Sequence, residues 1–306
     1  MKVWLKIHYP LFFVLIVAAV LRVNLLFVRG TWWFDEMFSV HYSLLPWGKA
    51  IKYWLLETNP FLYNLVLREW MNLFGQGEMI VRIPSLIFGL ITIAFVYYLG
   101  YKLISRRAAI VSSLIISLSG IHLFASVETR TYALFTLLTA LSFYWFINIF
   151  VEQKIYRWTW PLFFLTQTAL LYSHLTALTV IIIQVLALVY FKTADRASRK
   201  KFLLTQSFSL LVWSFWFIPS LLPKLNTNSL YGWFFTYNSE SSNILTILST
   251  FFVNTDVPGF VLTLFAIILL GIIFYVFKVF SRQEEKNKGV LFILMLWSFV
   301  PALLGA

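Results

Sequence analysis

Long runs of apolar residues, bounded by short polar segments, recur along the chain from Pro10 to its C-terminus. A hydrocarbon core roughly 30 Å thick needs about 20 apolar residues for each helical crossing, and runs of that size are repeated. Backbone groups inside lipid must bond to one another, and the runs lack the alternation of a barrel strand. The pattern therefore predicts an all-α polytopic membrane protein with about nine transmembrane helices.

The first expected span covers about 10–28 and the last begins near Gly289. A single helix over 160–191 would be about 48 Å long, which is too long for one ordinary crossing. We therefore expect two short spans there, joined by a turn near Ser173 and His174. The remaining expected spans are about 80–104, 108–122, 131–150, 202–219 and 260–280.

Lysine and arginine fall in short clusters between the apolar runs, as in proteins that orient by the positive-inside rule. This pattern accounts for the formal charge of +12 without a nucleic-acid partner. It predicts a cytoplasmic N-terminus, with Lys2 and Lys6 ahead of a first span that remains as a signal anchor. Outer loops are then expected at about 30–79 and 221–258. The absence of cysteine excludes disulfides and thiolate metal sites.

The first outer loop has a mixed composition between residues 37 and 74, with tryptophans and tyrosines spaced among charged residues. Aromatic and amphipathic segments favour the headgroup region of a bilayer. We expect two juxtamembrane helices on the outer surface, broken at Asn59 and Pro60. Lys49, Lys52, Arg68 and Arg82 add positive charge to this face, which suits either a phosphate headgroup or plain interfacial anchoring.

Two adjacent carboxylates, Asp35 and Glu36, follow the first span and lie among aromatic residues. Neighbouring carboxylates in a partly apolar setting repel each other, which raises one pKa and favours a group that accepts a proton. Such a group serves as a general base. The alternative is that both residues stabilise the N-terminus of the next helix. The residues alone leave the two interpretations about equal.

Several other polar residues are expected on the same face. Arg130 suits the bidentate binding of a lipid-linked phosphate, although a local ion pair with Glu128 is the simpler interpretation. Glu57, beside Asn59, is expected to orient a substrate or bind a divalent cation, unless it is only solvated. His174, with His122 on a neighbouring turn, is a weak candidate for proton transfer or metal binding.

Five motifs, in this order and spacing, resemble the N-terminal core of GT-C glycosyltransferases. The closest type is the protein-O-mannosyltransferase-like and aminoarabinose-transferase-like group, and the resemblance covers about residues 1–190. The motifs are Trp33-Phe34-Asp35-Glu36; Asn59-Pro60-Phe61-Leu62-Tyr63 leading into Leu73-Phe74-Gly75; Arg82-Ile83-Pro84-Ser85-Leu86; Glu128-Thr129-Arg130-Thr131-Tyr132-Ala133-Leu134; and Leu171-Tyr172-Ser173-His174.

The resemblance implies transfer of a sugar from a polyprenyl-phosphate donor to a lipid, glycan or protein acceptor outside the plasma membrane. It implies a catalytic carboxylate at Asp35, with Glu36 beside it, and a donor-phosphate contact at Arg130. Glu128, Tyr132, Glu57, Asn59, Tyr63, Arg82 and His174 are the other expected substrate-binding residues. Family members often read His-Pro-Pro-Leu-Tyr over residues 59–63, so the asparagine here removes one candidate phosphate or proton contact.

A lipid-phosphate donor already carries its leaving group, and no nucleotide-binding glycine motif is found, so no cofactor is required by the sequence. A divalent cation is compatible with it. A single base and direct displacement predict inversion at the anomeric carbon. We expect one glycosyltransferase-like domain over 1–306, as part of a longer protein. The alternatives are a transporter or flippase for a lipid-linked substrate and an inactive truncated member of the family.

Overall fold

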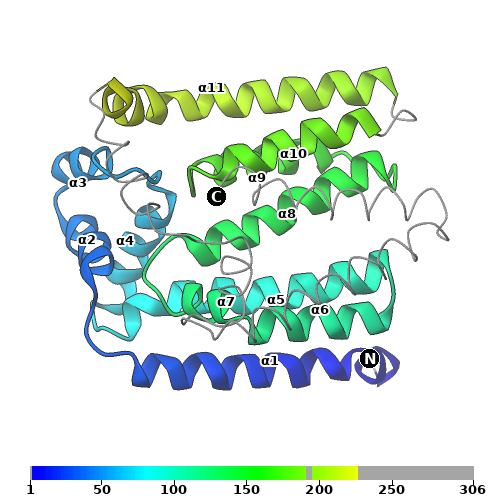
Figure 1. The fold of residues 1–306 in the computed structure, drawn as a ribbon, viewed down its shortest axis with the longest axis horizontal. Helices are drawn as coiled ribbons and strands as arrows, with labels where there is room; N and C mark the ends of the chain where they lie inside the picture. The colour runs from blue at the N-terminus through cyan, green and yellow to red at the C-terminus, as the bar shows by residue number, and fades with distance from the viewer. Residues whose placement is uncertain (1, 191–194, 227–306) are drawn as a thin grey trace, which may run out of the picture.

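The computed structural model describes residues 2–190 and 195–226, and every regular element in these ranges is helical. Seven helices run roughly side by side along the long axis of the molecule (Figure 1). These are α1 (Lys2–Val28), α5 (Ile83–Leu103), α6 (Arg106–Leu118), α8 (Tyr132–Phe150), α9 (Thr159–Leu171), α10 (Ala177–Tyr190) and α11 (Arg196–Asn226).

The shorter helices α2, α3 and α4 gather at one end of this bundle, on the left of Figure 1. We call this end the loop-1 end. The opposite end, which we call the basic end, carries the turns between α5 and α6 and between α8 and α9. The short elements are α2 (Phe34–Leu44), α3 (Trp47–Trp54), α4 (Leu62–Phe74), the 3-10 helix η1 (Ile80–Arg82) and α7 (Gly120–Ala125).

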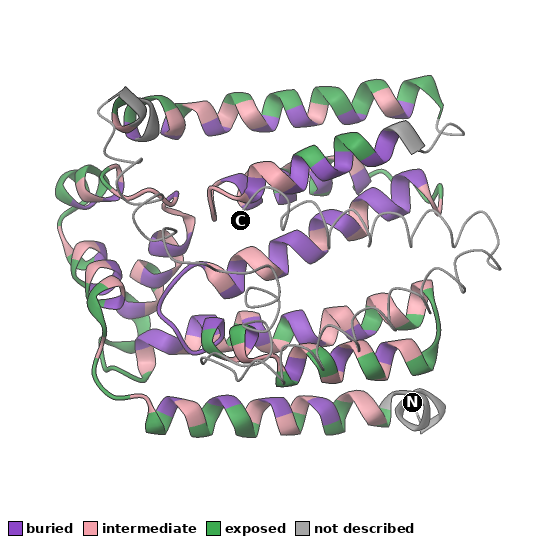
Figure 2. Cartoon of the chain, viewed as in Figure 1, coloured by how far each residue is buried: buried purple, intermediate pink, exposed green. Residues whose placement is uncertain are grey.

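The long helices form layers around α8. Helix α8 packs between α5 and α9, while α6 and α1 lie beyond α5 and α11 lies beyond α9. Two-thirds of the apolar window of α8 is buried, against about a fifth for α1 (67% and 22%). Figure 2 shows the same gradient, with exposed faces on α1 and α11. A helix that is apolar on all sides, such as α8, is therefore the centre of the bundle.

Four helices of the described residues are long and apolar enough to cross a membrane, and with the shorter apolar helix Ala177–Leu188 they identify a membrane protein. The four segments are Tyr9–Val28, Ile80–Leu103, Tyr132–Phe150 and Arg196–Ser220. They agree with four of the expected spans, although the last begins six residues earlier than expected. Asp195 explains this earlier start, because its carboxylate accepts hydrogen bonds from the backbone N–H and the hydroxyl of Ser198.

The expected division of 160–191 is confirmed, since α9 ends at Leu171 and α10 begins at Ala177. The expected single helix over 108–122 is wrong. It ends at Leu118, and α7 follows after Ser119, whose hydroxyl accepts the N–H of His122.

The first outer loop forms three helices instead of two. The break at Asn59 and Pro60 is present, and a second break lies at Leu45 and Pro46, where Pro46 precedes the first turn of α3. The expected spans 260–280 and from Gly289 onwards, and the loop 221–258 beyond Asn226, lie outside the described residues. The count of nine helices stays a prediction.

Gly89 allows α5 to approach the end of α7. A Cβ atom at this position would lie 2.7 Å from the Cβ of Ser126, which is too close for two carbon atoms. We expect Gly89→Ala to destabilise the fold by about 1–3 kcal/mol in thermal unfolding in detergent. Gly48→Ala in α3, where nothing lies within 4 Å, is the control and is expected to be neutral or slightly stabilising. Equal stability of both variants would contradict the close approach.

Candidate functional site

Asp35 and Glu36 lie in the first turn of α2, but their environments differ. The Asp35 side chain is 26% exposed and the Glu36 side chain is fully buried. Neither residue is the helix cap, because Trp33 occupies that position without a side-chain hydrogen bond. The two neighbouring carboxylates therefore serve different purposes, which the sequence alone does not separate.

Glu36 is the centre of a buried network. Arg82 donates to both of its carboxylate oxygens, from Nε at 3.0 Å and from Nη2 at 2.7 Å. The backbone N–H of Thr129 donates to Oε1 at 2.9 Å. Arg82 also donates to the carbonyl of Gly30 at 3.2 Å. Glu36 and Arg82 therefore tie together α2, η1, the end of α1 and the segment before α8.

The electrostatics of Glu36 follow from this network. Burial alone raises the pKa of a carboxyl group. The hydrogen bonds from Arg82 and Thr129 and the charges of Arg29 and Arg82 outweigh burial, so the pKa of Glu36 lies below its usual range. Glu36 is a permanently charged partner of Arg82. With Arg82 engaged and only 1% exposed, neither side chain is open to a substrate phosphate in this structure.

Arg130 lies between two acids that come from different segments. Its Nη2 is 3.7 Å from Asp35, and its Nη1 is 3.4 Å from Glu57 and 3.3 Å from the hydroxyl of Ser39. Its Nε is buried and has no hydrogen-bond partner among the described residues. Burial lowers the pKa of the guanidinium, but the charges of Glu57 and Asp35 raise it above the ordinary value. Arg130 is a buried, charged donor that its neighbours do not fully satisfy.

The expected local ion pair between Glu128 and Arg130 does not form. The Glu128 carboxylate instead pairs with Arg29 at 3.4 Å, at the end of α1. Burial raises the pKa of Glu128, and the charge of Arg29 only partly opposes this effect. The simple interpretation of Arg130 is thereby excluded, because its partners are the acids of the first loop.

Asn59 and Tyr63 reach the same place from the start of α4. They line a small pocket together with Ser39, Glu57 and Arg130. Its volume is about 10 Å³, close to the space that one water molecule needs. The Tyr63 hydroxyl lies 2.7 Å from that of Ser85, and burial raises the pKa of Tyr63.

Tyr132 and His174 lie near enough to Arg130 to interact with its charge, and their ring centres are 5.7 Å apart. The backbone N–H of Thr176 donates to Nδ1 of His174, so the neutral ring carries its proton on Nε2. Burial, aided by the charge of Arg130, lowers the pKa of His174 to about 4. His174 is therefore an uncharged hydrogen-bond donor at neutral pH.

The two histidines considered together in the sequence have different partners. The Nδ1 atom of His122 lies 2.8 Å from Nη2 of Arg22 in α1, away from the partners of His174. Within residues 2–190 and 195–226, no group of three or more acidic or histidine side chains is arranged to hold a metal ion.

The cations of the first loop also differ in their exposure and in their partners. Lys49 and Lys52 are exposed on α3. Arg68 donates to the carbonyls of Ser43 and Leu45 at 2.6 and 2.7 Å, which holds the break between α2 and α3. Only the two lysines are therefore free to contribute to a positive surface.

The low pKa of His174 predicts a dependence of stability on pH. The unfolded histidine binds a proton at a higher pH than the folded one, so the free energy of unfolding rises with pH between about 4 and 6.5. We expect His174→Gln to remove this component from a series of thermal unfolding curves in detergent. Parallel curves for the two proteins in that interval would contradict the burial of a neutral histidine.

Sequence reasoning missed several residues of this site. Ser39 is detectable in principle, because its spacing of four from Asp35 puts both on one face of a helix. The sequence indicates only that Arg29 marks the end of the first span, and not that it pairs with Glu128. Ser220 and Lys224 of α11 donate to the backbone carbonyls of Leu55 and Glu57, at 2.7–3.2 Å. No local pattern indicates these contacts.

A scan of protein families matches residues 58–218 to the family described as dolichyl-phosphate-mannose-protein mannosyltransferase. Together with the helical membrane architecture, this match defines a membrane glycosyltransferase of the GT-C type. Because it covers just over half of the 306 residues, the chain belongs to the dolichyl-phosphate-mannose-protein mannosyltransferase family. Neither the curated proteins nor the solved structures give a match.

The matched range contains Arg130, Glu128, Tyr132 and His174, together with Asn59, Tyr63 and Arg82. Asp35, Glu36 and Glu57 precede it. The matched range therefore includes the segment that carries Arg130, while the acids of the first loop lie outside it.

Proposed function

We propose that the chain transfers a sugar from a polyprenyl-phosphate donor to an acceptor hydroxyl or amine, with inversion at the anomeric carbon. The observation that carries this proposal is the pair of Asp35 and Arg130. A partly open carboxylate faces a buried guanidinium at 3.7 Å, in a chain whose family transfers sugars. A base and an anion-binding group side by side are what a displacement at a phosphate-activated sugar needs.

Asp35 is the general base of this proposal. Its carboxylate has no bidentate partner, unlike that of Glu36, and it remains in contact with solvent. A base must reach the proton that it removes, so accessibility favours Asp35 over Glu36. Glu36 then acts as a positioning residue, because it holds the first turn of α2 against Arg82 and Thr129.

The proposed reaction is a single displacement. Asp35 accepts the acceptor proton as the acceptor oxygen or nitrogen forms its bond to the anomeric carbon. The bond from that carbon to the phosphate oxygen breaks, and the polyprenyl phosphate leaves with the electron pair. Arg130 stabilises the negative charge that develops on the phosphate, through the planar guanidinium that suits two phosphate oxygens.

The ligand-free contacts of Arg130 fit this role. Two acids now neutralise it at 3.4 and 3.7 Å, which are loose distances for charge-assisted hydrogen bonds. Its Nε has no partner among the described residues. When a phosphate binds Arg130, the guanidinium exchanges two weak ion pairs for shorter hydrogen bonds to the phosphate. Glu57 is then released and can accept a hydrogen bond from a sugar hydroxyl.

The remaining candidates surround this pair. His174 supplies an uncharged N–H at neutral pH, and Tyr132 packs beside it. Asn59 and Tyr63 line the small pocket against Arg130. In the proposal they orient the donor, while Arg82 and Glu128 hold the backbone around it through Glu36 and Arg29. If a divalent cation took part, the carboxylates of Glu57 and Asp35 would hold it, and it would supply positive charge to the donor phosphate.

We propose that the loop-1 end faces the extracytoplasmic side of the plasma membrane, with the N-terminus in the cytoplasm. The described loops at the basic end carry clusters of lysine and arginine, which favours a cytoplasmic position. The residues in these clusters are Lys102, Arg106, Arg107, Lys154, Arg157, Arg196, Arg199, Lys200 and Lys201.

The experiment that tests the function follows a labelled sugar in sealed vesicles of known orientation, which contain the full chain and a labelled polyprenyl-phosphate-sugar pool. We expect the label to move from the lipid fraction to an acceptor on the extracytoplasmic side. The product is expected to have the opposite anomeric configuration, as measured by NMR. Matched vesicles without the chain are the control.

Two other results would each overturn the proposal. Movement of the label across the membrane while it remains attached to its lipid would favour a transporter or flippase. No movement at all, with the chain folded, would favour an inactive member of the family.

A further inference from the structure

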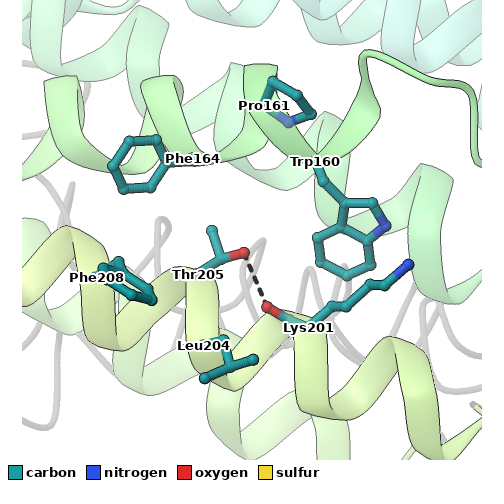
Figure 3. A pocket seen from close by; sticks show the side chains of 7 residues that line it. All are labelled: Trp160, Pro161, Phe164, Lys201, Leu204, Thr205 and Phe208. Carbon is teal, nitrogen blue, oxygen red and sulfur yellow. Dashed lines mark hydrogen bonds between the residues drawn. The ribbon is translucent and has the colours of Figure 1, made fainter.

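A groove lies between α9 and α11 (Figure 3). Its volume is about 470 Å³, and it is open along one side. Pro161 and Phe164 of α9 face Leu204 and Phe208 of α11 across it. This volume lies within the range of small-molecule sites in proteins. The wall is almost entirely apolar, which suits a hydrocarbon chain.

One end of the groove is polar. Figure 3 shows the indole nitrogen of Trp160 and the ammonium of Lys201 on the same side of the opening. The indole N–H is covered by neighbouring atoms and has no hydrogen-bond partner among the described residues. The hydroxyl of Thr205 is already used, because it donates to the carbonyl of Lys201 at 2.8 Å. The Lys201 ammonium is exposed, with Asp195 near enough for their charges to interact.

The groove opens at the basic end of the bundle. Arg157 precedes α9, Arg199 and Lys200 lie beside Lys201 in the first turns of α11, and no acidic residue lines the groove. A cation at the polar end of an apolar channel is complementary to an anion that carries a long apolar chain. A phospholipid phosphate has this chemistry at the depth where Trp and Lys side chains usually lie.

We propose that this groove binds an anionic phospholipid, with one acyl chain along α9 and α11 and the phosphate held at the polar end by the Lys201 ammonium. The site is separate from the proposed transfer reaction and does not depend on it. It lies between α9 and α11, which both run along the bundle between the loop-1 end and the basic end. Occupancy therefore adds stability to the packing of α11 on α9.

The first test measures lipid binding to the purified full chain by native mass spectrometry. The probes are phosphatidylglycerol and phosphatidylcholine with the same acyl chains. We expect phosphatidylglycerol to bind more tightly, and Lys201→Gln to weaken it by about five-fold while phosphatidylcholine is unchanged.

Arg107→Gln is the matched control, because it removes one positive charge at the same end from an exposed position on α6. It is expected to leave lipid binding unchanged. Equal effects of Lys201→Gln and Arg107→Gln would show only a general attraction to positive charge and would overturn the site. Equal binding of the two lipids by the unmodified chain would also overturn it.

The second test identifies the occupant of the groove directly. A photoreactive amino acid in place of Leu204, which is 46% exposed, is activated in bilayers that contain phosphatidylglycerol. We expect a cross-link to lipid, detected as a mass increase of the chain. A cross-link from position 204 to residues 227–306 of the chain, or to a second copy, would show that protein fills the groove and would overturn the proposal.

Discussion

Asp35→Asn is expected to abolish sugar transfer while it leaves the fold in place. Removal of a general base lowers rates by about 10²–10⁴-fold. The amide keeps the shape of the side chain, and Arg130 keeps its second acid, Glu57, at 3.4 Å. Because the Asp35 side chain is 26% exposed and 3.7 Å from its partner, the lost ion pair is worth under about 1 kcal/mol. The measurement is transfer from labelled donor at matched expression, with thermal unfolding alongside.

Glu78→Gln is the matched control for this variant. Glu78 is an exposed acid between α4 and η1, and it forms no ion pair with any residue of 2–190 or 195–226. We expect it to retain full activity. If Asp35→Asn kept more than about a tenth of the activity, Asp35 would not be the base. A loss of activity that accompanied a large loss of stability would instead assign Asp35 to the fold.

Glu36→Gln is expected to cause the largest loss of stability of any single change in the site. It leaves the Arg82 guanidinium buried, 1% exposed, without its counter-charge. Breaking a buried ion pair by removing one partner costs about 3–5 kcal/mol. For a chain of this size the melting temperature falls by on the order of 10 °C. Thermal unfolding in detergent measures the effect.

The pH dependence of this effect has a definite sign. The pKa of Glu36 is lowered in the folded protein, so its stabilisation is present above the ordinary pKa of glutamate. That stabilisation is lost as the pH falls through the lowered value. The difference in unfolding free energy between the natural chain and Glu36→Gln therefore shrinks in acid.

A double variant, Glu36→Met with Arg82→Met, separates charge from packing. Replacement of a buried pair by apolar residues of similar volume is often close to neutral. We expect it to recover much of the stability that Glu36→Gln loses. A loss below about 1 kcal/mol in the single variant would show that the pair is not desolvated, contrary to its geometry.

Much of the fold is predictable, because backbone groups inside lipid must bond to one another and apolar spans must therefore form helices of a set length. Apolar length alone gave the segments that became α1, α5, α8 and α11, and a limit on helix length gave the break between α9 and α10. The errors came from short-range signals. Ser119 starts the new helix α7 by accepting the N–H of His122 at its hydroxyl, and Pro46 divides a segment expected to be continuous. Both are single residues within stretches of otherwise helical composition.

The site was less predictable, because its pairings depend on distant segments. The sequence indicates that Asp35, Glu57 and Arg130 lie on the same side of the membrane, but not that Arg130 contacts both acids. Apart from the family resemblance, which implies Asp35, the residues give no means to tell Asp35 from Glu36. That distinction arises from Arg82, which is 46 residues further along the chain and pairs with only one of them.

The contact between α11 and the first loop has a consequence for biosynthesis. The carbonyls of Leu55 and Glu57 receive their hydrogen bonds from Ser220 and Lys224, 163–169 residues later in the chain. At about 5–20 residues per second, a ribosome needs roughly 8–30 s to add that length. For that interval the segment that carries Glu57 has emerged without its final partners. The segment that carries Glu57 therefore receives these backbone hydrogen bonds only after α11 has been made.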